Sequence, residues 1–135
     1  MKITQHLLAH KKTYFAIAVI WTGIVTYYCL KDGLTLPTVL PKHADKVGHA
    51  VFHFGIVVFW FLALKARFYG SSTAVVLKKC ILISVIFGIV IEGYQSFFTA
   101  TRSADWRDVL ANCTGTIIAS LLVFIIRTRF YKSVD

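Results

Sequence analysis

The chain has 135 residues, 57% of them hydrophobic, and a formal net charge of +9. A soluble domain is nearer to about 45–50% apolar, so this composition excludes an ordinary soluble domain and predicts an integral membrane protein. Lysines and arginines stand in short clusters between apolar runs, as in membrane proteins that use them to set their orientation. Because no nucleic-acid reader motif accompanies them, we expect no nucleic-acid partner.

Four apolar runs are long enough to cross a membrane, for which a helix needs about 20 residues. We expect spans at residues 13–30, 47–64, 80–99 and 109–126. Pro37 and Pro41 interrupt helical periodicity after the first run, and Gly70 separates the second from the third. The sequence therefore predicts an all-α integral membrane four-helix bundle, with residues 1–135 forming a single domain.

Basic residues predict the orientation of this bundle. Four spans place both termini on one side, together with the connection between the second and third spans. These segments hold most of the cationic side chains: Lys2, Lys11, Lys12, Lys65, Arg67, Lys78, Lys79, Arg127, Arg129 and Lys132. Because cytoplasmic segments are enriched in lysine and arginine, we expect a multi-pass cell-membrane protein with cytoplasmic termini. The stretch Arg102–Asn112 then faces the extracytoplasmic side.

Polar residues recur at helical spacing near the expected outer ends of three spans. They are Lys46, His49 and His53 on the second, Gly88, Glu92 and Gln95 on the third, and Asp105, Asp108, Asn112 and Gly115 on the fourth. An ionisable residue inside a span is costly, so it usually faces a protein interior or a water-filled cavity and has a partner. We therefore expect these groups to converge in one layer just below the outer interface.

The charged members of this set also have structural interpretations. Asp105 is a natural N-cap for the fourth span, and Asp45 is an equally good cap for the second. Glu92 could form a salt bridge with Arg102 or Lys46. Snorkelling to the interface, or pairing with lipid phosphates, is an alternative role for the three cations Lys46, Arg102 and Arg107.

The uncharged members leave similar alternatives open. His53 could be a neutral histidine that is hydrogen-bonded within the bundle, and Asn112 and Gln95 could join helices by hydrogen bonds. His49 and His53 stand at i and i+4, and with Glu92 they resemble a zinc-hydrolase ligand set. The HExxH pattern is missing, however, so we expect no metal and no other cofactor.

Three separate motifs resemble those of the VanZ-like family. Asp45–His49 resembles its DKxxH element, and Glu92–Gln95 resembles its ExxQ element. Arg102–Gly115 resembles the signature RxxDxxDxxxNxxG. The resemblance covers the chain from about Asp45 onward, and His53 corresponds to no position that we recognise in the family.

Members of that family are small bacterial membrane proteins, named after a protein associated with resistance to the glycopeptide teicoplanin. The resemblance implies a role in the cell envelope but supplies no reaction, so whether the chain is an enzyme stays open. It carries over nine candidate site residues. Those with conjectured acid/base or orienting roles are His49, Glu92 and Asp105, and those with conjectured ligand-binding roles are Asp45, Lys46, Gln95, Arg102, Asp108 and Asn112.

Three functional hypotheses follow. The first is a polar site at the outer membrane face for a lipid-linked or cell-wall-related anionic ligand, with a link to teicoplanin resistance. The second is a membrane enzyme acting on a phospholipid or polyprenyl-phosphate headgroup, in which His49 and Glu92 are the acid and base and Asp105 orients a partner. The third is a small proton-linked transporter that uses His53 and Glu92. Membrane lipid is the expected partner in the first two.

Overall fold

The structure is a computed structural model and describes residues 10–31, 44–98 and 105–130. Within these ranges it contains four helices, α2 (Lys11–Leu30), α3 (Ala44–Arg67), α4 (Thr73–Phe98) and α5 (Trp106–Phe130). By length and composition, all four could cross a membrane. The prediction of an all-α protein with four apolar spans is therefore confirmed.

The third span begins earlier than its apolar run predicts. α4 starts at Thr73, whereas the sequence-based boundary lay at Cys80. Ser72 explains the start, because its hydroxyl oxygen accepts a hydrogen bond of 3.3 Å from the backbone N–H of Val75. The exposed Lys78 and Lys79 in the second turn are compatible with a spanning helix, since their side chains can reach the membrane interface.

The second span ends later than expected. α3 continues to Arg67, so Lys65, predicted to follow the span, lies within the helix and is buried. Its ammonium group donates a hydrogen bond of 2.7 Å to the backbone carbonyl of Ser71. This contact joins the end of α3 to the turn that precedes α4.

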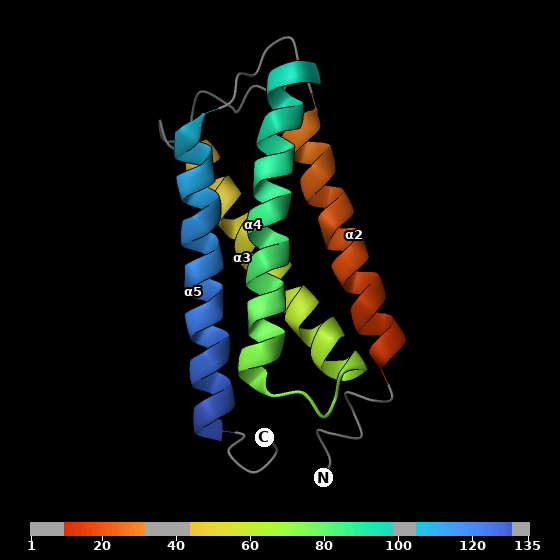
Figure 1. Ribbon diagram of the computed structural model, residues 1–135. Helices are drawn as coiled ribbons and strands as arrows, with labels where there is room; N and C mark the ends of the chain where they lie inside the picture. The colour runs from red at the N-terminus through yellow and green to blue at the C-terminus, as the bar shows by residue number, and fades with distance from the viewer. Residues whose placement is uncertain (1–9, 32–43, 99–104, 131–135) are drawn as a thin grey trace.

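α3 is the central helix of the bundle. It packs most extensively against α5 and then against α2, and it also contacts α4. In Figure 1, α3 crosses behind α4 from the side of α5 toward the start of α2. α2 begins, and α5 ends, at the lower end of the bundle in Figure 1.

Two apolar clusters hold the helices together. One joins α3, α4 and α5 through Val57, Phe61, Val76, Leu77, Cys80, Ala119 and Val123. The other joins α2, α3 and α4 through Val25, Cys29, Ile56 and Ile91. Because surrounding lipid is as apolar as these side chains, the clusters contribute through close packing more than through removal of water.

α3 and α5 approach each other closely at Gly115. A Cβ atom at this position would lie only 2.7 Å from the carbonyl carbon of Ala50, much closer than non-bonded carbon atoms approach. Glycine therefore allows the two backbones to meet, as small residues commonly do between membrane helices. This contact determines how the polar face of α5 is presented to α3.

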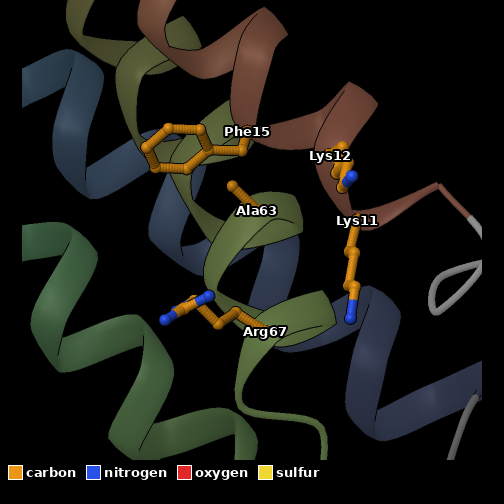
Figure 2. Close-up of a pocket in the computed structure, with 5 residues that line it drawn as sticks. All are labelled: Lys11, Lys12, Phe15, Ala63 and Arg67. Carbon is orange, nitrogen blue, oxygen red and sulfur yellow. The ribbon is translucent and has the colours of Figure 1, made fainter.

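The end of the bundle where α2 begins and α3 ends is basic. A cavity of about 660 Å³ lies there, and Figure 2 shows the residues that line it: Lys11, Lys12, Phe15, Ala63 and Arg67. The polar side chains of the sequence motifs lie on the opposite halves of α3, α4 and α5. One end of the bundle is thus basic, and the other end holds the polar motif residues.

Candidate functional site

Asp105 caps α5 and also binds α3. Its Oδ1 accepts a hydrogen bond of 2.9 Å from the backbone N–H of Arg107, and its carbonyl accepts one of 2.9 Å from the N–H of Asp108. The expected N-cap is therefore confirmed. The second carboxylate oxygen, Oδ2, lies 2.7 Å from Nζ of Lys46. Capping thus fixes the carboxylate in a position from which it reaches the neighbouring helix.

Lys46 is surrounded by carboxylates. Besides Asp105, its ammonium group forms ion pairs with Asp45, at 3.1 Å, and with Asp108. Asp45 lies in the first turn of α3, which begins at Ala44, so the prediction that Asp45 is the N-cap was wrong. The Lys46 side chain is only 22% exposed, so these pairs are partly shielded from water.

His49 lies one turn deeper and is buried between the three helices. Its Nδ1 is 3.1 Å from Oδ1 of Asn112 and 4.0 Å from Oε1 of Glu92, and its Nε2 is 3.8 Å from Oδ2 of Asp108. With the amide oxygen of Asn112 facing the ring, Nδ1 carries the hydrogen and donates it. Nε2, the other ring nitrogen, is on the side of Asp108, 3.8 Å from its Oδ2 atom.

Glu92 and Asn112 both have buried polar atoms beside His49 that lack a hydrogen-bond partner among the described residues. Both oxygens of Glu92 and Nδ2 of Asn112 are buried and have no hydrogen-bond partner among the described residues. Buried polar groups in proteins are nearly always hydrogen-bonded, so each exception needs an explanation. Two acceptor atoms and one donor group are therefore available beside His49 for a ligand, water or ion.

Gly88 leaves space for this arrangement. A Cβ atom there would lie 3.0 Å from Cε1 of His53 and 3.2 Å from Nδ2 of Asn112, closer than most real contacts of this kind. The absent side chain lets the amide of Asn112 and the ring of His53 lie against α4. The expectation that Gly88 permits a close helix approach therefore fits the geometry.

His53 and Gln95 make contacts of their own. Nδ1 of His53 is 2.8 Å from Oγ of Ser84, which is in turn 2.7 Å from Oγ1 of Thr116. The amide of Gln95 donates a hydrogen bond of 2.7 Å to the carbonyl of Cys29, on α2. Both contacts match the interhelical hydrogen-bonding roles that the sequence left open.

The remaining residues therefore define the candidate site, which we call the polar layer. It consists of Asp45, Lys46, His49, Glu92, Asp105, Asp108 and Asn112. Arg102 falls outside the described residues. Arg107 is exposed, and its guanidinium group lies over the ring of Trp106, 5.8 Å from the ring centroid.

Comparison with protein families matches residues 4–127 to the VanZ/LLP1 family. The chain belongs to the VanZ/LLP1 family. The resemblance inferred from the three motifs is thereby confirmed, and the match extends to α2, which the motifs did not reach. Comparisons with curated proteins and with solved structures gave no match. Family membership and four apolar helices together support a multi-pass membrane protein.

The motifs of this VanZ/LLP1 chain meet in space, although they are far apart in sequence. The DKxxH element supplies Lys46 and His49, and the RxxDxxDxxxNxxG signature supplies the carboxylates and the amide that bind them. The ExxQ element is divided, because Glu92 faces His49 whereas Gln95 binds α2. The motif residues of α3 and α5 therefore form one connected unit.

Ser84 and Thr116 were not predicted in this VanZ/LLP1 chain. Both are almost fully buried, and they continue the polar contacts from His53. Thr116 also donates to the backbone carbonyl of Asn112, which connects the hydroxyl groups to the polar layer. A single hydroxyl in an apolar run carries little signal by itself. The spacing of Thr116 four residues after Asn112 was the only clue available.

Electrostatics in the polar layer is dominated by negative groups. The layer contains the carboxyl groups of Asp45, Glu92, Asp105 and Asp108 but only one ammonium group, that of Lys46. At the exposed edge, hydrogen bonds from the Lys46 ammonium and from the backbone N–H of Arg107 lower the pKa of Asp105 below its ordinary value. Asp105 is therefore held as a carboxylate at neutral pH.

Proposed function

We propose that this VanZ/LLP1 protein binds the headgroup of a lipid-linked, cell-wall-related anionic ligand at the outer face of the bacterial cell membrane. The observation that carries the proposal is the set of unsatisfied buried atoms on Glu92 and Asn112 beside Lys46 and His49. A ligand that supplies hydrogen-bond donors to Glu92 and an acceptor to Asn112 would satisfy all of them.

The position of these atoms favours a headgroup of a membrane lipid. Exposure falls from the edge of the layer, where the Asp45 side chain is 42% exposed, to Glu92, whose side chain is 6% exposed. A headgroup at the membrane interface would therefore meet charged residues first and the unsatisfied atoms deeper in the bundle. A lipid that carries both a phosphate and hydroxyl or amide groups, as a glycosylated polyprenyl phosphate does, matches this order.

The anionic part of the ligand is expected at the rim. Lys46 is engaged by three carboxylates, so a phosphate would have to compete with Asp105, the most exposed of its cross-helix partners. Arg107 lies at the same edge and can bind phosphate through two parallel hydrogen bonds. Arg107 lies in the first turn of α5, whose backbone N–H groups also favour an anion.

The distribution of charge favours a location of the polar layer at the outer face. The cationic residues Lys11, Lys12, Lys65, Arg67, Lys78, Lys79, Arg127 and Arg129 lie toward the end of the bundle opposite the polar layer. Because cytoplasmic segments are enriched in such residues, that basic end would be cytoplasmic and the polar layer would open outward. The family takes its name from a protein associated with teicoplanin resistance, which favours a cell-wall precursor as the natural ligand.

Binding to defined lipids tests the proposal. The purified protein in nanodiscs would be titrated with a polyprenyl phosphate, with its glycosylated form and with phosphatidylcholine. We expect preferential binding of the glycosylated polyprenyl phosphate, weakened about tenfold by Glu92→Gln or by Asn112→Leu, since each removes one or more hydrogen bonds. His53→Gln is the matched control, because it alters a buried polar residue that contacts Ser84 instead. Equal affinity for all three lipids would reject the proposal.

A membrane enzyme is the second candidate, favoured by the contacts of His49. Its ring is oriented by Asn112 through Nδ1 and faces Asp108 through Nε2, an arrangement that suits a general acid or base. The same lipids, assayed for release of phosphate or sugar, would distinguish catalysis from binding. Turnover by the wild type that is abolished by His49→Ala would establish the enzyme; binding without turnover would favour the first proposal.

A further inference from the structure

His49, Glu92 and Asp108 form a cluster that none of the motifs assigns to a metal. One ring nitrogen of His49 and one carboxylate oxygen from each acid all lie within 4.8 Å of one another. The three residues come from α3, α4 and α5, so the cluster is built by the fold and not by neighbours on one helix. It differs from the His49, His53 and Glu92 set considered from sequence, because His53 is bound to Ser84.

Glu92 provides the first independent reason to place a ligand here. The residue is 5% exposed, and both of its oxygens lack a hydrogen-bond partner among the described residues. Buried carboxylates in proteins are normally paired with a cation or coordinated to a metal, because an isolated buried charge is very unfavourable. Lys46 is hydrogen-bonded to Asp105 and Asp108 instead.

The histidine provides a second reason. With Nδ1–H donated to Asn112, Nε2 of His49 is the ring nitrogen that can bind a cation, and it lies 3.8 Å from Oδ2 of Asp108. A cation placed between these two atoms would bind both of them. Histidines that bind metals usually donate their other ring N–H to an oxygen, as His49 does to Asn112.

The separations are close to those of a coordinated ion. Metal–nitrogen and metal–oxygen bonds of about 2.0–2.2 Å place neighbouring ligand atoms about 3–3.4 Å apart. The distance of 3.8 Å from Nε2 of His49 to Oδ2 of Asp108 is somewhat longer, and the three ligand atoms together lie within 4.8 Å of one another. Side-chain rotations that move the carboxylates by about 1–2 Å would bring all three atoms to one ion, within the range of ordinary rotamer adjustment.

We propose that His49, Glu92 and Asp108 bind a divalent first-row cation, Zn²⁺ or Mn²⁺. The imidazole favours these ions over Mg²⁺ and Ca²⁺, which prefer oxygen ligands alone. Two positive charges would offset the excess of carboxylates in the polar layer. Three protein ligands also leave a coordination position open for a water molecule or for an oxygen of a ligand. The cation site stands on this geometry and does not depend on the proposed lipid.

Metal titration of the full chain tests the inference. Protein purified in detergent and stripped with EDTA would be titrated with ZnCl₂ and MnCl₂ by calorimetry, and Co²⁺ would be used as a spectroscopic substitute. We expect one tight site, with affinity reduced at least about tenfold in Glu92→Gln and in Asp108→Asn. Tetrahedral or five-coordinate absorption bands of Co²⁺ should appear in the wild type and be lost in both variants.

One matched control keeps the test specific. His53→Gln removes a neighbouring buried histidine that contacts Ser84 and lies outside the polar layer. It should retain metal affinity within about twofold. If Glu92→Gln does not fold, the metal affinities of Asp108→Asn and His49→Gln are compared with that of the wild type instead. Absence of stoichiometric uptake by the wild type, or uptake that these substitutions leave unchanged, would overturn the proposal.

The proposed cation site and the proposed lipid binding can be rejected independently of each other. Lipid binding that persists in EDTA, together with no metal uptake, would reject the cation site and leave the proposed function intact. Metal uptake that depends on Glu92 and Asp108, in a protein that binds none of the three lipids, would establish the cation site and reject the proposed function.

Discussion

Asn112 of α5 accepts a hydrogen bond from Nδ1 of His49 of α3, with 3.1 Å between the two atoms and both side chains buried. The contact joins the two helices that pack together most extensively, and it fixes which nitrogen of His49 carries the hydrogen. Both proposed activities of His49, as an acid or base and as a metal ligand, depend on this orientation.

Replacing Asn112 by leucine should therefore destabilise the protein. The substitution keeps the number of side-chain heavy atoms but leaves a buried ring N–H without an acceptor, which costs about 1–3 kcal/mol. Chemical unfolding of the detergent-solubilised protein would measure the loss. Thr114→Val on the same helix is the control, because this exposed hydroxyl only donates to the carbonyl of Leu110. Equal stability of Asn112→Leu and Thr114→Val would contradict the assigned contact.

The ion pairs of Lys46 should differ in strength. Double-mutant cycles with Lys46→Met should give a coupling of about 1–3 kcal/mol to Asp108, whose side chain is 14% exposed. The coupling to Asp45, whose side chain is 42% exposed, should stay below about 1 kcal/mol because water screens it. The unfolding free energies of the single and double variants give both values. A stronger coupling to Asp45 than to Asp108 would show that the pairs are ranked wrongly.

Gly115 should tolerate no side chain. Gly115→Val would force α3 and α5 apart at Ala50 and is expected to cost about 3 kcal/mol or more, at the upper end of overpacking effects. Gly93→Ala is the matched control, since a Cβ atom there meets nothing within 4 Å. Alanine at position 93 should be neutral, or stabilising by up to about 1 kcal/mol. Thermal unfolding in detergent would compare them, and a mild effect of Gly115→Val would argue against the close helix approach.

The lowered pKa of Asp105 predicts that the stability of the protein decreases in acid. The pKa of its carboxyl is lowered in the folded protein, so its contribution to stability is complete above the ordinary aspartate pKa and disappears as the pH falls through the lower, folded value. Asp105→Asn removes the charge but keeps a good N-cap residue. The melting temperature of the wild type should exceed that of Asp105→Asn at pH 6, and the difference should shrink as the pH falls below the ordinary aspartate pKa of about 4. A difference that grows in acid would mean that the sign is wrong.

The four spans were predictable because the length and apolarity of each run are local properties of the sequence. The meeting of Lys46 with Asp105 and Asp108 was expected from helical spacing and similar depth, and the structure places them together. The divided roles of Glu92 and Gln95 were not expected. These residues are three positions apart, so they differ by about 60° around the helix axis, enough to turn one toward α3 and the other toward α2.

Sequence spacing does not determine how each helix is rotated about its axis. That rotation is set by contacts such as Gly115 against Ala50 and Gly88 against His53, which depend on which helices become neighbours. The same limitation explains His53. It shares a face of α3 with His49, but one turn deeper it meets Ser84 of α4, whose hydroxyl could not be placed in advance. The start of α4 was missed because hydropathy marks the apolar part of a helix and not its capped end.

The division of the polar layer among the helices has a consequence for biosynthesis. Lys46 and His49 lie on α3 and Glu92 on α4, but the groups that pair with Lys46 and orient His49 across the bundle come from α5, the last of the described helices to leave the ribosome. Until α5 inserts, the nascent chain holds a lysine, a histidine and a glutamate in the bilayer without these counterparts. Membrane quality-control proteases would therefore find a recognisable signal in any chain whose synthesis stops before α5.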